Sequence, residues 1–199
     1  MKKKFNEEIL YEHLNKLEYW KQLVFLITIS QRLVPNFLAF EKETDYKGGE
    51  KLVSAIEKAW SFLLKGQFFI DLSEEQLECE NLAPDTEDYE TVLVSPALDA
   101  AVAVSLLMKA FSTHDTHIIV EATSLMNDTL DMYIQELMDI DTFDPDIEEK
   151  IEQHPLMQKE LKRQTEDLSF LLNLDRSIVN SISIAYEKWF KHYSSCLNL

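Results

Sequence analysis

The chain has 199 residues, of which 46% are hydrophobic and 28% charged, a composition that fits a globular protein and excludes a disordered one. Its formal net charge of −17 at pH 7 repels nucleic-acid phosphates and anionic lipid surfaces, so we expect no direct binding to nucleic acid or membranes. Only 3 glycines occur, against about 14 at average usage. Because tight hairpin turns prefer Asn-Gly, Asp-Gly or Gly-Gly pairs, this scarcity favours helices over sheets.

Apolar residues recur at helical spacing along the chain, with short interruptions between the periodic stretches. The stretch 18–33 is apolar around most of its circumference, so we predict that it forms the central, buried helix. Pro35 is expected to kink or restart that helix, because a mid-helix proline loses a hydrogen bond and clashes with the preceding turn. The predicted helical stretches cover residues 5–17, 18–33, one or two further turns at 36–43, 50–65, 73–79, 96–111, 116–139, a short stretch ending at 154, 155–172 and 176–193.

Two serines are predicted to cap helices. Ser73, with a glutamine three residues later, has the capping-box pattern, and Ser95 precedes a proline suited to a first helical position. The stretch 81–94 between them is expected to be a loop. The helical stripes also place Ile9, Met132 and Leu137 on inward faces. Together these patterns predict an all-α fold, one single-domain multihelical bundle of about eight or nine helices over residues 1–199.

The charge is concentrated in residues 66–149, here called the acidic middle segment. It holds 21 acidic side chains and one basic one, Lys109, for a net charge of −20. Residues 1–65 carry +2 and residues 150–199 carry +1. This segment is either a surface for a basic protein partner or a solvated face that keeps the protein soluble.

Cysteine usage and the first residues favour a cytoplasmic protein. Cys79 and Cys196 match no metal or redox spacing and are predicted to be free thiols. The lysines at 2–4 are followed by acidic residues instead of the apolar stretch of a secretory signal. The longest apolar run, 23–29, is too short to span a bilayer.

One cluster of metal-type ligands stands out. His117 and Glu121 share a helical face, and with His114 they supply two imidazoles and a carboxylate, a set that zinc accepts. An ordinary polar helix start is the competing interpretation. No histidine follows a glutamate by three residues, which excludes the usual di-iron bundle. The stretch 139–150 fails as a calcium loop at the positions of the glycine and the final glutamate. No cofactor is predicted.

The sequence contains no phosphate loop, dinucleotide fingerprint or nucleophile elbow. Two charged residues within apolar helices draw attention instead. Arg32 ends the most apolar helix, and Asp99 lies in a first helical turn, where the helix dipole favours an anion. We predict that Arg32 and Asp99 pair across two packed helices, with two separate surface positions as the alternative.

Several short segments resemble a known family. They are Leu17-Glu18, Trp20, Arg32, Pro35-Asn36, Phe40, Trp60, Pro96-Ala97 and Asp99-Ala100, with Pro155 and Glu160 further on. In combination they resemble the YjaG family of bacterial proteins, domain of unknown function 416, best over residues 14–112. The resemblance implies an all-helical bacterial cytosolic protein of about this length, and it implies no activity, cofactor or site.

Without a catalytic motif, our leading hypothesis is a non-enzymatic interaction protein whose acidic middle segment binds a basic protein partner. The alternative is an enzyme, small-molecule binder or metal-binding protein with a site between helices. A homodimer joined by an apolar helix face is a further possibility.

Overall fold

The computed structural model describes residues 4–138, 144–174, 178–190 and 193–199. These residues form α-helices and one short 3₁₀ helix, and no strand occurs among them. The helices are α1 (Glu7–Leu14), α2 (Tyr19–Glu43), α3 (Gly49–Leu64), α4 (Ser73–Glu80), the 3₁₀ helix η1 (Thr86–Asp88), α5 (Val94–Thr113), α6 (Thr116–Met138), α7 (Ile147–Gln153), α8 (Pro155–Leu172) and α9 (Ile178–Trp189). The predicted all-α multihelical bundle is confirmed.

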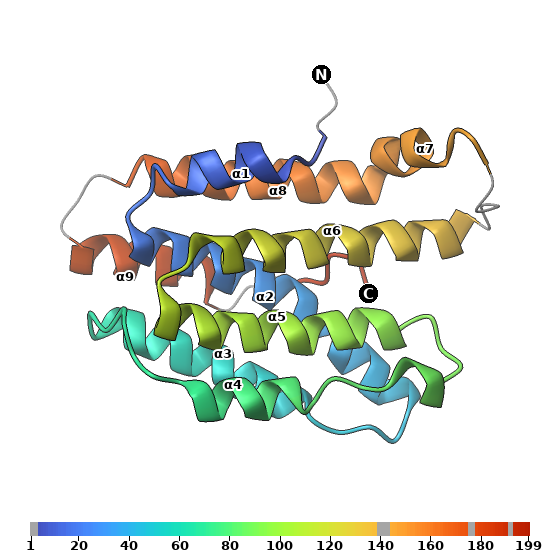
Figure 1. The fold of residues 1–199 in the computed structure, drawn as a ribbon, viewed down its shortest axis with the longest axis horizontal. Helices are drawn as coiled ribbons and strands as arrows, with labels where there is room; N and C mark the ends of the chain where they lie inside the picture. Colours follow the sequence, from blue (N-terminus) through green and yellow to red (C-terminus); the bar gives the residue numbers. More distant parts are fainter. Residues whose placement is uncertain (1–3, 139–143, 175–177, 191–192) are drawn as a thin grey trace.

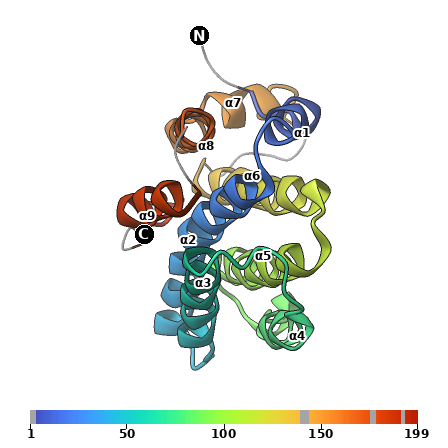
Figure 2. The ribbon, with the colours of Figure 1, turned by 90° about the vertical axis from the view of Figure 1, so that its left-hand side faces the viewer.

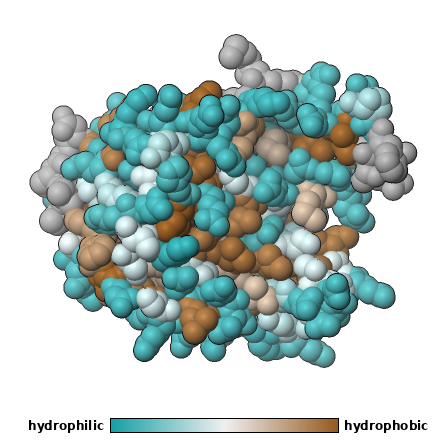
Figure 3. All heavy atoms as spheres, in the orientation of Figure 1, coloured by the Kyte–Doolittle hydropathy of each residue, from teal (hydrophilic) through white to brown (hydrophobic). Residues whose placement is uncertain are grey.

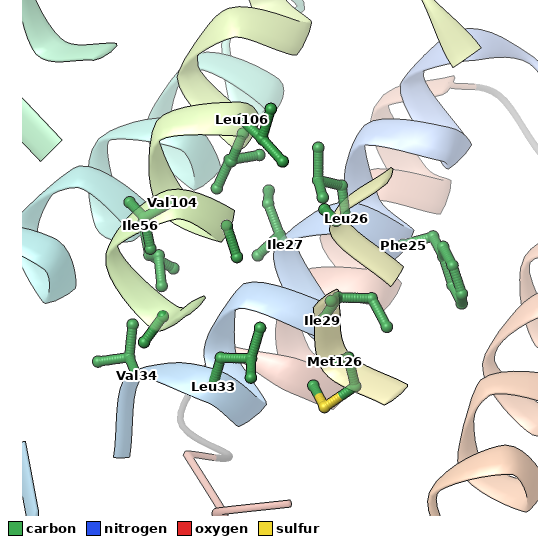
Figure 4. Packing of buried hydrophobic residues seen from close by; sticks show 14 of the residues in the cluster. Phe25, Leu26, Ile27, Ile29, Leu33, Val34, Ile56, Val104, Leu106 and Met126 are labelled. Atoms are coloured by element: carbon green, nitrogen blue, oxygen red, sulfur yellow. The ribbon is translucent and has the colours of Figure 1, made fainter. Parts of the chain in front are cut away.

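Helix α2 is the centre of the fold. Every residue from Trp20 to Val34 is buried, because α3, α5, α6 and α8 all pack against this helix. Figure 2 shows α2 between α9 on one side and α5 and α6 on the other, with α1 and α8 above. Figure 4 shows side chains of α2 meeting Ile56 of α3, Val104 of α5 and Met126 of α6. The prediction of a central buried helix is confirmed.

Pro35 does not restart the helix. Helix α2 continues through it to Glu43, with Val34, Asn36 and Phe37 buried on either side. The proline still removes one backbone donor. Packing around the helix outweighs this loss, since tertiary burial routinely overrides local propensity.

Helix α2 and helix α5 are both long and apolar enough to cross a membrane by length and composition. The longest apolar run in the sequence, residues 23–29, is therefore much shorter than helix α2, which spans Tyr19–Glu43. In the folded chain, 83% of an apolar 18-residue stretch of α2 and 78% of the corresponding stretch of α5 lie buried inside the protein. Their apolar surface is thus covered by neighbouring helices.

Two predicted helix starts differ from the structure. Helix α4 begins at Ser73 itself, and Asp71 accepts a hydrogen bond from the Ser73 backbone N–H. Helix α5 begins at Val94, so Pro96 lies in the first turn, where its missing N–H costs no intrahelical bond. The predicted loop 81–94 contains η1.

Three apolar side chains expected to face inward are exposed. Ile9 is 54% exposed on α1, and Met132 and Leu137 are 54% and 56% exposed near the end of α6. Helical periodicity identifies a face but not the point where the neighbouring helix ends. Figure 3 shows the result on one side of the molecule, a mainly hydrophilic surface with apolar side chains emerging in patches.

The segment after α9 packs against α2. The backbone N–H of Cys196 donates to the carbonyl oxygen of Arg32, and the Ser195 hydroxyl donates to Asn36 Oδ1. Cys196 and Leu197 are buried. Both cysteines are free, as predicted.

Candidate functional site: a charged core cluster and an outer groove

The predicted metal ligands do not converge. His114 ends α5 with a left-handed backbone, its ring lies 4.0 Å from that of Tyr19, and its Nε2 lies 3.1 Å from the carbonyl oxygen of Phe68. The ring of His117 instead stacks on Tyr11 at 4.4 Å. Within the described part of the chain, no group of three or more His, Cys, Asp or Glu side chains is placed to hold a metal ion. The structure therefore does not bring the two imidazoles of the predicted zinc set together, because each ring contacts a different aromatic neighbour.

Arg32 and Asp99 take different partners. Arg32 Nε donates to Glu160 Oε1 at 3.0 Å, and its Nη1 donates to Asp167 Oδ2 at 2.8 Å. Asp99 Oδ2 accepts a hydrogen bond of 2.7 Å from the Thr129 hydroxyl of α6. No ion pair between Arg32 and Asp99 is found among the described residues. The predicted pairing is corrected accordingly: α8 reaches Arg32, while Asp99 faces α6.

The Arg32 cluster is deeply buried. The side chains of Arg32, Glu160 and Asp167 are 8%, 1% and 9% exposed. Burial disfavours the charged guanidinium, but the two carboxylates more than offset it and hold the pKa of Arg32 above its ordinary value. Burial raises the pKa of Glu160 despite the attraction of Arg32. Gln164 donates to Glu160 Oε1 and to Asn127 Oδ1 at 3.3 Å each, which extends the cluster toward α6.

Asp99 provides a pH-dependent test of the fold. Burial raises its pKa to about 6, with the Thr129 hydrogen bond acting in the opposite direction. The folded state therefore binds the Asp99 proton more tightly than the unfolded state, so stability falls as the pH rises through about 6. We expect Asp99→Asn to raise the free energy of unfolding by about 2–3 kcal/mol at pH 7.5 and to have little effect at pH 4.

Urea unfolding of both proteins between pH 4 and pH 8 measures this difference. Asparagine keeps an acceptor for Thr129, so the comparison isolates the charge. Stability curves that run parallel over this range would contradict the assignment.

A groove lies on the outside of the bundle between α1 and α8, with a cavity volume of about 720 Å³. Figures 1 and 2 show both helices lying over the layer of α2 and α6. The residues that line the groove are Lys4, Phe5, Asn6, Ile9, Leu10, His13, Lys16, Leu17, Leu161, Gln164, Thr165, Leu168, Ser169 and Leu172. The exposed Ile9 and Leu172 belong to its walls. Ile9, which the sequence analysis predicted to face the core, therefore lines this groove instead.

The charge of the groove is opposite to that of the chain. None of the described residues that line it is acidic, although the chain carries 36 acids and 19 lysines and arginines. Lys4 pairs with Glu152. Lys16 and His13 lie at the other end of α1, and no ion pair is found for either among the described residues. One end of the apolar groove therefore carries basic side chains without ion-pair partners among the described residues.

Sequence reasoning missed Glu160, Gln164 and Asp167 as a unit. Their spacing of four and then three residues places them on one face of α8, and that polar face within an amphipathic helix was the available signal. The groove has no comparable signal, because its walls come from helices at opposite ends of the sequence.

The described residues thus define an all-α multihelical protein with a charged cluster in its core and an apolar groove on its outside. The model of the family described as "Protein of unknown function (DUF416)" matches residues 9–185, and the chain belongs to this family. The predicted resemblance is confirmed and extends beyond its predicted best range.

Relatives are found in several bacteria. The uncharacterized protein YjaG of Salmonella typhimurium is 27% identical over 107 residues, and an uncharacterized protein of Haemophilus influenzae is 28% identical over 108 residues. Each match covers 54% of this chain and 55% of the relative, so it spans about half of either length. A crystal structure of a DUF416 family protein from Shewanella baltica has a TM-score of 0.84, covering 95% of this chain and 97% of that one, at 22% identity. This structural likeness shows a shared fold.

Proposed function

We propose that this protein binds a single-chain anionic amphiphile, of the fatty-acid type, in the groove between α1 and α8. The observation that carries the proposal is the combination of apolar walls with a lining that holds three basic and no acidic residues among those described. A volume of about 720 Å³ lies within the usual range of about 300–1,000 Å³ for small-molecule sites. No catalytic group is needed for this role.

The apolar tail has a continuous surface to bury against. Leu161, Leu168 and Leu172 recur on one face of α8, and Ile9 and Leu10 of α1 lie across from them. Each methylene removed from water contributes about 0.8 kcal/mol, so a tail of ten or more carbons supplies the main driving force. Affinity should rise with tail length until the groove is filled.

The charged head has one available end. Lys16 and His13 follow α1 toward its carboxyl end, whereas Lys4 at the other end is already neutralised by Glu152. In a chain of net charge −17, an anion is repelled by most of the surface and attracted here. The head is therefore expected to lie beside Lys16.

Lys16→Glu is expected to weaken dodecanoate binding at least fivefold and to leave binding of the uncharged dodecanol unchanged. The reversal of charge removes the attraction for the head without altering the apolar walls. Isothermal titration calorimetry below the critical micelle concentration measures both affinities. Lys65→Glu is the matched control, since Lys65 is exposed at the end of α3 and does not line the groove.

Two results would overturn the proposal. One is the absence of saturable dodecanoate binding to the unmodified protein. The other is an equal loss of affinity in Lys16→Glu and Lys65→Glu, which would reflect the overall charge of the chain.

A basic protein partner for the acidic middle segment stays a prediction. Supporting it, exposed acids follow one another along α4, η1 and the adjoining loop: Glu74, Glu78, Glu80, Asp85, Glu87, Asp88 and Glu90. Among the described residues, the ion pairs that neutralise this segment are Lys58–Glu75 and Lys150–Asp144. A pull-down at low and moderate salt tests it, because screening weakens steering by exposed charge. Retention that does not change with salt would remove its basis.

A further inference from the structure

The lining of the groove between α1 and α8 contains one deeply buried polar side chain, that of Gln164. This residue is 5% exposed. The other uncharged polar residues of the lining, Asn6, Thr165 and Ser169, are all exposed, so water reaches them whether or not the groove is filled. Gln164 is therefore the polar group whose hydrogen bonding a bound ligand changes most.

Two hydrogen bonds fix the orientation of the Gln164 amide. Its Nε2 donates to Glu160 Oε1 and to Asn127 Oδ1, at 3.3 Å each. Both partners are acceptors, because Glu160 Oε1 also accepts from Arg32, and the Nδ2 group of Asn127 donates to the carbonyl oxygen of Thr123. Exchanging the nitrogen and oxygen of the amide would therefore place oxygen against oxygen. Nε2 points toward this buried pair, and Oε1 points away from it.

The outward atom, Gln164 Oε1, has no donor among the described residues. It is also not one of the unpaired side-chain atoms that are sealed from solvent, so it keeps accessible surface. Because Gln164 lines the groove, a molecule in the groove can reach this oxygen. Water serves the oxygen while the groove is open to solvent.

A plain fatty acid would leave this oxygen without a partner. Its tail displaces water from the groove and offers no donor, so a nearly buried acceptor loses its hydrogen bond. The head group cannot supply a donor either, because an ionised carboxylate only accepts hydrogen bonds. A hydroxyl on the tail would replace the displaced water.

The place of Gln164 along the groove sets the position of that hydroxyl. The ion pair of Lys4 with Glu152 holds the start of α1 beside the segment that leads into α8, and Figure 1 shows the two helices running in the same direction. The end of α1 that carries Lys16 therefore lies toward Leu172, the last residue of α8 in the lining. Gln164 comes eight residues before Leu172, or about 12 Å along the helix. The hydroxyl thus belongs several carbons away from the carboxylate.

We propose that the ligand of the groove is a fatty acid with a hydroxyl in the middle of its chain, which donates to Gln164 Oε1 while the carboxylate lies beside Lys16. This inference rests on the proposed function and narrows its ligand class, with Gln164 as the residue that determines specificity. The sign of the effect is diagnostic. A hydroxyl makes a tail more soluble in water, so a groove without a partner for it would bind the hydroxylated tail more weakly.

Isothermal titration calorimetry of the full chain with dodecanoate and with 5-, 7- and 9-hydroxydodecanoate tests the proposal, each hydroxy acid being used as its separate enantiomers. At least one of them is expected to bind about three- to tenfold more tightly than dodecanoate, the gain from one net hydrogen bond. Gln164→Met removes the acceptor at similar volume and is expected to abolish this preference while retaining dodecanoate binding. Gln158→Met is the matched control and should keep the preference, because Gln158 lies on the same helix and does not line the groove.

The outcomes separate this inference from the proposed function. Saturable dodecanoate binding with no hydroxy acid bound more tightly would overturn the hydroxyl assignment and leave the groove as a fatty-acid site. The absence of saturable binding for all four acids would overturn both. A preference that survives in Gln164→Met would show that another group receives the hydroxyl. The comparison of ligands on the unmodified protein does not depend on the variant, and dodecanoate binding to Gln164→Met verifies that its groove is intact.

Discussion

Replacing Arg32 by methionine is expected to lower the free energy of unfolding by about 3–5 kcal/mol, because it leaves two buried carboxylates without their counter-ion. The side chains of Glu160 and Asp167 are only 1% and 9% exposed, so water cannot substitute for the guanidinium. Methionine fills much of the same volume, which separates the loss of charge from the opening of a cavity. Urea unfolding at pH 7 measures the difference.

A triple variant tests the electrostatic origin of that loss. Adding Glu160→Gln and Asp167→Asn to Arg32→Met removes the stranded charges and is expected to recover a large part of the stability. Lys162→Met, which replaces an exposed cation on α8, should change stability by less than about 0.5 kcal/mol. A loss below about 1 kcal/mol in the single variant would show that the cluster does not hold α8 to α2.

Trp60→Ala is expected to cost about 3–5 kcal/mol, the usual range for removing a buried aromatic side chain. Trp60 is fully buried on α3, and its ring meets that of Tyr186 on α9 edge-on, with centroids 5.6 Å apart. The truncation therefore opens a cavity where α3 and α9 meet. Thermal and urea unfolding both report the loss.

Trp60→Phe should be much milder, at about 1–2 kcal/mol. The indole Nε1 has no hydrogen-bond partner among the described residues, so the smaller ring also removes an unpaired buried donor. A phenylalanine variant as unstable as the alanine variant would contradict this view of the site.

Helix positions could be predicted because burial and helical period coincide in this chain. The predicted helix over 155–172 matches α8, where a proline suits the first turn and the apolar stripe runs to the end. Helix starts were less predictable. Ser73 and Ser95 are suitable capping residues, yet the N-cap positions are occupied by Leu72 and Leu93. The helices therefore begin at Ser73 itself and at Val94, one residue before Ser95.

Contacts between helices could not be predicted in the same way. The sequence marks Arg32 as an unusual charge in an apolar helix, but helical spacing reveals only which face it occupies. Its partner helix depends on the packing of the whole bundle, and α8 is more than 100 residues away along the chain. His114 and His117 show the same limit, since neighbours in sequence turn toward different aromatic rings.

The attachment of the final segment to α2 has a consequence for the order of assembly in the cell. Asn36 finds its partners, Ser195 and Cys196, about 160 residues further along the chain. Arg32 likewise waits for α8 before its charge is matched. When only the first half of a nascent chain has emerged, helix α2 is therefore incompletely packed, because its partners from the second half have not yet been synthesised. During that interval, we expect chaperones to bind the exposed apolar surface of α2.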